Sequence, residues 1–221
     1  MKITDGLYAF LWSDQRENNA NAYLIKGKQN ILIDPGHNHL FPYLASRLAS
    51  LSLRPDDIDL VLITHAHPDH MESARRFYRL PALIAIQKTE MDFIRSLGPS
   101  YDYGPATEAP DFQPDFLLRE GELHLEEMIF QVLHTPGHSP GSLCLYWPLK
   151  KALFSGDVIF HQGLGRTDLP GGNAEALKTT IRRLSQLDVE YLLPGHGGWV
   201  SGRQQVKDNF ENVETEWFGY L

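Results

Sequence analysis

Residues 64 to 70 read Thr-His-Ala-His-Pro-Asp-His, and the interpretation of the whole chain depends on this short stretch. It directly follows the apolar run Leu60-Val61-Leu62-Ile63, which predicts a buried β-strand. In an extended segment, side chains two residues apart point to the same side, so His65 and His67 can face one ion together. Histidine is the usual neutral nitrogen ligand for zinc or iron, and the stretch therefore predicts a metal site.

The end of the stretch adds two further candidate ligands. Asp69 and His70 fall in the first turn of a helix that is expected to begin near Pro68. Two pairs of ligands then leave one strand-to-helix corner in different directions, as two neighbouring metal ions require. Alternatively, Asp69 caps the helix N-terminus and the histidines line a turn. A cap does not explain three imidazoles within six residues.

Size and composition indicate one ordinary globular domain covering residues 1–221. Twenty basic and 28 acidic residues give a formal charge of -8, and without a Lys/Arg-rich run nucleic acid is not expected as a partner. The single cysteine, Cys144, excludes an intrachain disulfide framework. The start lacks an apolar signal core and no run is long enough to span a membrane, so we expect a cytoplasmic protein without a membrane partner. A homodimer is compatible with this composition.

Alternating apolar runs and helical patterns predict an α/β fold. Strands are expected at about 3–12, 21–26, 30–33, 83–86, 123–125, 128–134, 142–147, 152–155 and 190–193, and helices at about 40–51, 68–79, 88–97, 174–187 and 203–218. Residues 98–116 interrupt this order with four prolines, and we expect either a lid over the site or an ordinary surface excursion.

Three later apolar strands also end in turns that carry His or Asp. These turns hold His138, Asp157 and His196, and strand ends of this kind form the sites of helix-flanked sheets. The complete candidate set is His65, His67, Asp69, His70, His138, Asp157 and His196. Seven ligands are too many for one tetrahedral ion and suit two ions that share a carboxylate and a bridging water. An all-nitrogen and oxygen set suits zinc, iron or manganese.

In this order, the motifs resemble those of the metallo-β-lactamase superfamily, whose fold is a four-layer αββα sandwich of two mixed sheets flanked by helices. The likeness extends from Ile33 to His196. It implies a first metal held by His65, His67 and His138, a second held by Asp69, His70 and His196, and Asp157 as the bridge between them.

Within the superfamily, residues 134–142 and 155–172 are similar to glyoxalase II, the hydroxyacylglutathione thioesterases. The resemblance implies a dinuclear hydrolase of a small thioester or ester, with a metal-bridging hydroxide as nucleophile and Asp69 and Asp157 as catalytic carboxylates. Two divalent ions are expected, zinc first, with iron or manganese as alternatives. Only about twenty-five residues follow His196, fewer than the C-terminal helical region that supplies part of the glutathione site in typical glyoxalase II.

Other functions stay open from the sequence. The related persulfide dioxygenases use a single iron, for which His65, His138 and Asp157 would form a two-histidine, one-carboxylate set. A lactonase has the same ligand requirements as a thioesterase. A binding domain that uses metal only for stability is disfavoured, because closed structural zinc sites usually employ cysteine.

Substrate contacts have no readable code in this sequence. We name His161, Arg166 and Tyr103 as candidates because they lie near the ligand motifs or in the long loop. Arg166 would bind a substrate carboxylate with both arms of its guanidinium, or it would form a structural ion pair with Asp168.

Overall fold

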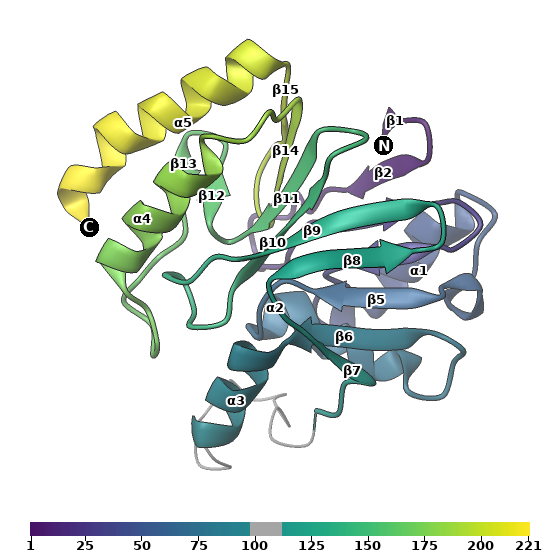
Figure 1. Cartoon of the computed structure of the whole chain (residues 1–221). Helices are drawn as coiled ribbons and strands as arrows, with labels where there is room; N and C mark the ends of the chain where they lie inside the picture. The colour runs from purple at the N-terminus through teal and green to yellow at the C-terminus, as the bar shows by residue number, and fades with distance from the viewer. Residues whose placement is uncertain (98–111) are drawn as a thin grey trace. The chain divides into compact units, whose positions relative to one another are not determined.

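A computed structural model describes residues 1–97 and 112–221 of the chain (Figure 1). The chain divides into two compact units, Met1–Leu118 and Arg119–Leu221. Most of the expected lid, and with it Tyr103, lies outside the described residues. Among the described residues, no helix combines the length and the apolar character needed to cross a membrane.

The first unit is built on a seven-stranded mixed sheet in the order β1-β2-β3-β4-β5-β6-β7. Its first four strands pair antiparallel and the pairs from β4 to β7 are parallel. The strands are β1 Lys2–Thr4, β2 Leu7–Phe10, β3 Ala22–Ile25, β4 Ile31–Ile33, β5 Leu60–Ile63, β6 Leu83–Gln87 and β7 Phe116–Leu118.

The single strand expected over residues 3–12 is wrong, because the chain reverses there. Gly6 adopts a φ of 77°, a left-handed conformation that glycine tolerates without a steric penalty, and this turn separates β1 from β2. The hairpin of β3 and β4 and the strand before the histidine stretch are confirmed. All four residues of β5 are buried, as a parallel strand covered on both faces requires.

The helices of the first unit are α1 Phe41–Ala49, α2 Pro68–Met71 and α3 Lys88–Leu97, with 3-10 turns η1 Asn38–Leu40, η2 Pro55–Asp57 and η3 Glu72–Phe77. The helix expected over 68–79 is therefore one α-turn followed by a 3-10 segment. The backbone N–H of Ser73 donates at 2.8 Å to the carbonyl of Gly36, outside the helix, which interrupts the α-helical hydrogen bonds. Buried side chains such as Leu44, Leu48 and Phe77 pack in the core of this unit.

The second unit is built on a six-stranded mixed sheet in the order β15-β14-β11-β10-β9-β8. Only the β11 and β14 pair is parallel within it. The strands are β8 Gly121–Leu125, β9 Met128–His134, β10 Leu143–Trp147, β11 Ala152–Gly156, β14 Tyr191–Pro194 and β15 Val200–Ser201. A separate hairpin joins β12 Ile159–Phe160 to β13 Gly163–Leu164.

Two helices and a final 3-10 turn complete this unit: α4 Ala174–Leu184, α5 Arg203–Trp217 and η5 Phe218–Tyr220 (green to yellow in Figure 1). Asn173 is the N-cap of α4, and its side-chain oxygen accepts the N–H of Ala176 at 2.9 Å. Cys144 is fully buried in β10, as expected for a strand residue. Two large mixed sheets with flanking helices confirm the α/β fold class.

Candidate metal centre

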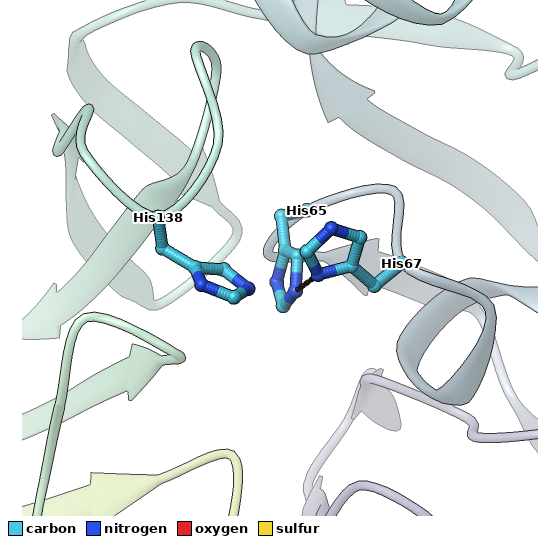
Figure 2. Close-up of side chains that lie close together, drawn as sticks. All are labelled: His65, His67 and His138. Atoms are coloured by element: carbon cyan, nitrogen blue, oxygen red, sulfur yellow. Dashed lines mark hydrogen bonds between the residues drawn. The ribbon is translucent and has the colours of Figure 1, made fainter. Parts of the chain in front are cut away.

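Two of the predicted ligands stand directly after β5. His65 is buried, and its Nε2 lies 3.0 Å from Nδ1 of His67, one of them donating to the other (Figure 2). Two nitrogens bound to one tetrahedral zinc at about 2.0–2.1 Å would lie roughly 3.3 Å apart. The two rings are therefore already spaced as ligands of one ion, as the two-residue alternation predicted.

The orientation of the third histidine in this stretch is fixed by a buried carboxylate. Nδ1 of His70 donates at 2.8 Å to Oδ2 of Asp34, and both side chains are almost completely excluded from solvent. Asp34 also accepts the Thr64 N–H at 2.9 Å and the Thr64 hydroxyl at 2.7 Å. With Nδ1 protonated, His70 presents the lone pair of Nε2, which is the arrangement of metal-binding histidines that have a carboxylate partner.

Asp69 does not occupy the N-cap position of α2. That position is His67, and its side chain makes no capping hydrogen bond. Oδ2 of Asp69 instead accepts the side-chain N–H of Asn18 at 2.7 Å and lies 3.8 Å from Nε2 of His70. The interpretation of Asp69 as a helix cap is therefore wrong, and the carboxylate lies beside an imidazole nitrogen.

A second buried carboxylate holds the loop between the first two histidines. The backbone N–H of Ala66 donates at 2.9 Å to Oε1 of Glu90, a residue of α3 that is 1% exposed. Glu90 therefore fixes the backbone of the His-Ala-His segment without belonging to the ligand set.

The second unit brings its three predicted ligands together around one carboxylate. Oδ2 of Asp157, directly after β11, lies 3.6 Å from Nε2 of His138 and 3.4 Å from Nε2 of His196. His138 extends from the loop after β9 (Figure 2), and His196 follows β14. One carboxylate oxygen faces two imidazole nitrogens, which fits a bridging ligand between two cations.

The loop around Gly165 positions these groups. Nδ1 of His138 donates at 2.7 Å to the backbone carbonyl of Arg166, which leaves Nε2 toward Asp157. A Cβ atom on Gly165 would lie 1.8 Å from the Asp157 carbonyl oxygen and 3.1 Å from Nδ1 of His138. Only glycine fits here, because the backbone passes so close to both ligand residues.

The candidate substrate residues are less defined. The guanidinium of Arg166 forms two 2.7 Å hydrogen bonds with Asp168, and this pairing lowers the pKa of the Asp168 carboxyl to about 2. The structure therefore shows the ion-pair alternative for this side chain. His161 is exposed between β12 and β13.

Sequence reasoning missed three residues that hold the candidate ligands or their loop in place, namely Asp34, Asn18 and Glu90. Asp34 carried a usable signal, because it follows the apolar strand β4 and precedes Pro35-Gly36, the same arrangement that marked the ligands. Asn18 and Glu90 carried none, because they act on residues far from them in the sequence.

Comparison with known proteins identifies the family. The family sequence model of the metallo-beta-lactamase superfamily matches residues 16–196 of the chain. The chain is 32% identical over 188 residues to the hydroxyacylglutathione hydrolase GloC of Haemophilus influenzae, covering 82% of this chain and 86% of that protein. It is 32% identical over 209 residues to the acyl-coenzyme A thioesterase MBLAC2 of Gallus gallus, covering 81% of this chain and 73% of that protein.

A solved structure, TTHA1623 in a di-iron-bound form, shares the fold with a TM-score of 0.70 and 31% identity, covering 91% of this chain and 95% of that one. The predicted family resemblance is confirmed. The chain belongs to the metallo-beta-lactamase superfamily and is a metal-dependent hydrolase.

Proposed function

We propose that this protein hydrolyses a small thioester or ester with two divalent metal ions, zinc first and iron or manganese as alternatives. The observation that carries the proposal is the orientation of His70 and His138. Each uses Nδ1 to donate to a fixed oxygen, that of Asp34 or of the Arg166 carbonyl, and so presents Nε2 as a ligand. This arrangement is typical of histidines that bind a metal through the other ring nitrogen.

The proposal assigns the seven ligands as the family resemblance implies, with residues 1–221 acting as one domain. His65, His67 and His138 would hold the first ion, Asp69, His70 and His196 would hold the second, and Asp157 would be shared by both. The relative with a di-iron centre supports a two-metal arrangement. The donor set fits hard or borderline divalent ions, because it contains nitrogen and oxygen and no thiolate.

When bound, two such ions supply an activated water as nucleophile and polarise the acyl oxygen. The chain holds the groups around them in place. Asp157 keeps Oδ2 between two imidazoles, and Asn18 fixes Oδ2 of Asp69 through a 2.7 Å hydrogen bond. No serine or cysteine nucleophile is needed, and the only thiol, Cys144, is buried in a strand.

The thioester class is supported by two relatives whose names specify different thiols, glutathione in one and coenzyme A in the other. The shared chemistry is the acyl-sulfur bond, and we propose that class without choosing the thiol. His161, Arg166 and Tyr103 stay the proposed substrate contacts. Arg166 would have to exchange Asp168 for a substrate carboxylate.

The experiment compares Asp157→Ala with Asp208→Ala in metal content and in hydrolysis of a panel of small thioesters. Asp208 is an exposed carboxylate of α5 that accepts a side-chain hydrogen bond from Gln204, so its loss controls for removal of one negative charge. We expect Asp157→Ala to lose bound metal and thioester turnover, while Asp208→Ala keeps both. Unchanged turnover in Asp157→Ala would refute the proposal.

The same preparations separate the hydrolase from the iron dioxygenase. Iron-loaded protein is supplied with glutathione persulfide in an oxygen electrode. The hydrolase proposal predicts no oxygen consumption above that of Asp157→Ala. Rapid oxygen uptake by the wild type, without thioester hydrolysis, would replace the proposed function by the dioxygenase.

A further inference from the structure

A second group of metal-ligand side chains lies in the first unit and contains none of the seven proposed ligands. It consists of His37, His39 and Glu72, whose ligand atoms all lie within 4.8 Å of one another. Nδ1 of His37 is 2.9 Å from Oε2 of Glu72, and the ring centroids of His37 and His39 are 5.2 Å apart. The proposed function makes no use of this group, which we call the His37 cluster.

Two members of the His37 cluster are held in place by hydrogen bonds to neighbouring residues. Glu72 is 8% exposed, and its Oε2 also accepts the N–H of Asn38 at 3.2 Å. The N–H of His37 donates to Oδ1 of Asn19 at 2.8 Å, and its carbonyl accepts the Ser73 hydroxyl at 2.8 Å. A carboxylate and an imidazole are therefore fixed side by side, and only the third ligand needs freedom to adjust.

That third ligand is His39, whose side chain is 53% exposed. Its Nε2 is hydrogen-bonded to Oε1 of Glu17, another partly exposed side chain. A carboxylate partner of this kind orients an imidazole toward a metal. Solvent access at His39 also leaves room for water in the remaining coordination position.

The composition of the cluster favours a transition metal. Two histidines and one glutamate are an open zinc ligand set, whereas calcium and magnesium prefer oxygen donors. An ordinary histidine-glutamate pair looks different elsewhere in the chain. His124 and Glu122 of β8 lie 2.8 Å apart, but both are 62% exposed, and no third potential ligand is grouped with them in the part of the chain that the structure describes.

We propose that His37, His39 and Glu72 bind one additional divalent ion of the zinc type, separate from the two ions of the proposed function. The ion would connect the loop after β4 to η3. It would also stabilise the segment that contains Glu17, whose neighbour Asn18 donates to Asp69 at 2.7 Å. Occupancy of the His37 cluster would thus support the position of one proposed ligand of the catalytic centre.

The test is the number of zinc ions bound by the holoenzyme at saturating zinc, measured by equilibrium dialysis and elemental mass spectrometry. Wild type is compared with His39→Ala, and His124→Ala is the matched control that removes an exposed histidine paired with glutamate. We expect His39→Ala to bind one ion fewer than wild type and His124→Ala to bind the same number. Equal binding by wild type and His39→Ala would overturn the proposal.

Two further variants make the outcome independent of folding and of the proposed function. Glu72→Gln keeps the size of the side chain but removes its charge, and it should also lose one ion. When His39→Ala is added to Asp157→Ala, the double variant should still bind one ion fewer than Asp157→Ala alone, because the two sites share no ligand. Equal binding by the double variant and Asp157→Ala would assign the lost ion to the catalytic centre instead.

Discussion

Replacing Asp34 by Asn tests whether a buried carboxylate sets the protonation of His70. Asp34 receives three hydrogen bonds: Oδ1 accepts the Thr64 N–H, and Oδ2 accepts the Thr64 hydroxyl and His70 Nδ1. In Asp34→Asn the amide oxygen can still accept the Thr64 N–H, so the amide NH₂ takes the place of Oδ2. His70 must then accept at Nδ1 and carry its proton on Nε2, where a metal-bound histidine needs a lone pair.

The size of the effect follows from these contacts. Hydrogen bonds to a charged group contribute about 1.5–3 kcal/mol each and neutral ones about 0.5–1.5 kcal/mol. Two of the three change from the first kind to the second, so we expect Asp34→Asn to lower the free energy of unfolding by about 2–3 kcal/mol. Loss of a partner that orients a ligand typically weakens metal binding by roughly 10–100-fold.

Urea unfolding of the metal-free protein measures the first quantity, and competition with a chromophoric chelator measures the second. Asp59→Asn is the matched control, because Asp59 is exposed and its carboxylate accepts one described hydrogen bond, from the Asn30 N–H at 2.7 Å. The control should keep wild-type metal affinity. Wild-type affinity in Asp34→Asn as well would refute the argument that Asp34 fixes the tautomer of His70.

Three other predictions concern positions near the centre or in the core. Gly165→Ala places a Cβ 1.8 Å from a backbone oxygen and should lower the free energy of unfolding by at least about 3 kcal/mol, measured by thermal unfolding. In the control Gly163→Ala the nearest atom to the new Cβ is 3.8 Å away, so the loss should be less than about 1 kcal/mol. Glu90→Ala removes the acceptor of a buried N–H in the His-Ala-His segment and should lower the free energy of unfolding by about 1–3 kcal/mol in urea; an unchanged midpoint would contradict that role. Burial raises the pKa of the Cys144 thiol to about 12, so this thiol should resist iodoacetamide at pH 8 until the protein is unfolded, and rapid labelling of the folded protein would contradict this. The free energy of unfolding should fall as pH rises from about 9 toward 12, because only the unfolded thiol ionises in that range.

Much of the fold could be predicted because its signals are local. The buried strand β5 is a continuous apolar run. Helices α3 and α4 show helical spacing of apolar residues with clear limits, and their bounds were predicted to within a few residues. The candidate ligands were also identified from local signals, because they follow the ends of strands. His138, Asp157 and His196 were predicted to converge on that basis, and the second unit brings them together.

The features that were missed depend on contacts distant in the sequence. The helix after His70 changes to a 3-10 segment because the N–H of Ser73 donates to Gly36, a partner much earlier in the chain that periodicity does not reveal. Asp34 and Glu90 act on the ligand loop from other elements in the same way. Arg166 contributes its backbone carbonyl to His138, and no side-chain pattern predicts a backbone contact.

The most direct test is a crystal structure of the metal-loaded protein with anomalous diffraction recorded at the zinc and iron edges. We predict two peaks about 3.5–4 Å apart. One should contact His65 and His67, the other should contact His70, and both should contact Asp157. A single peak, or peaks that contact none of these side chains, would contradict the dinuclear centre.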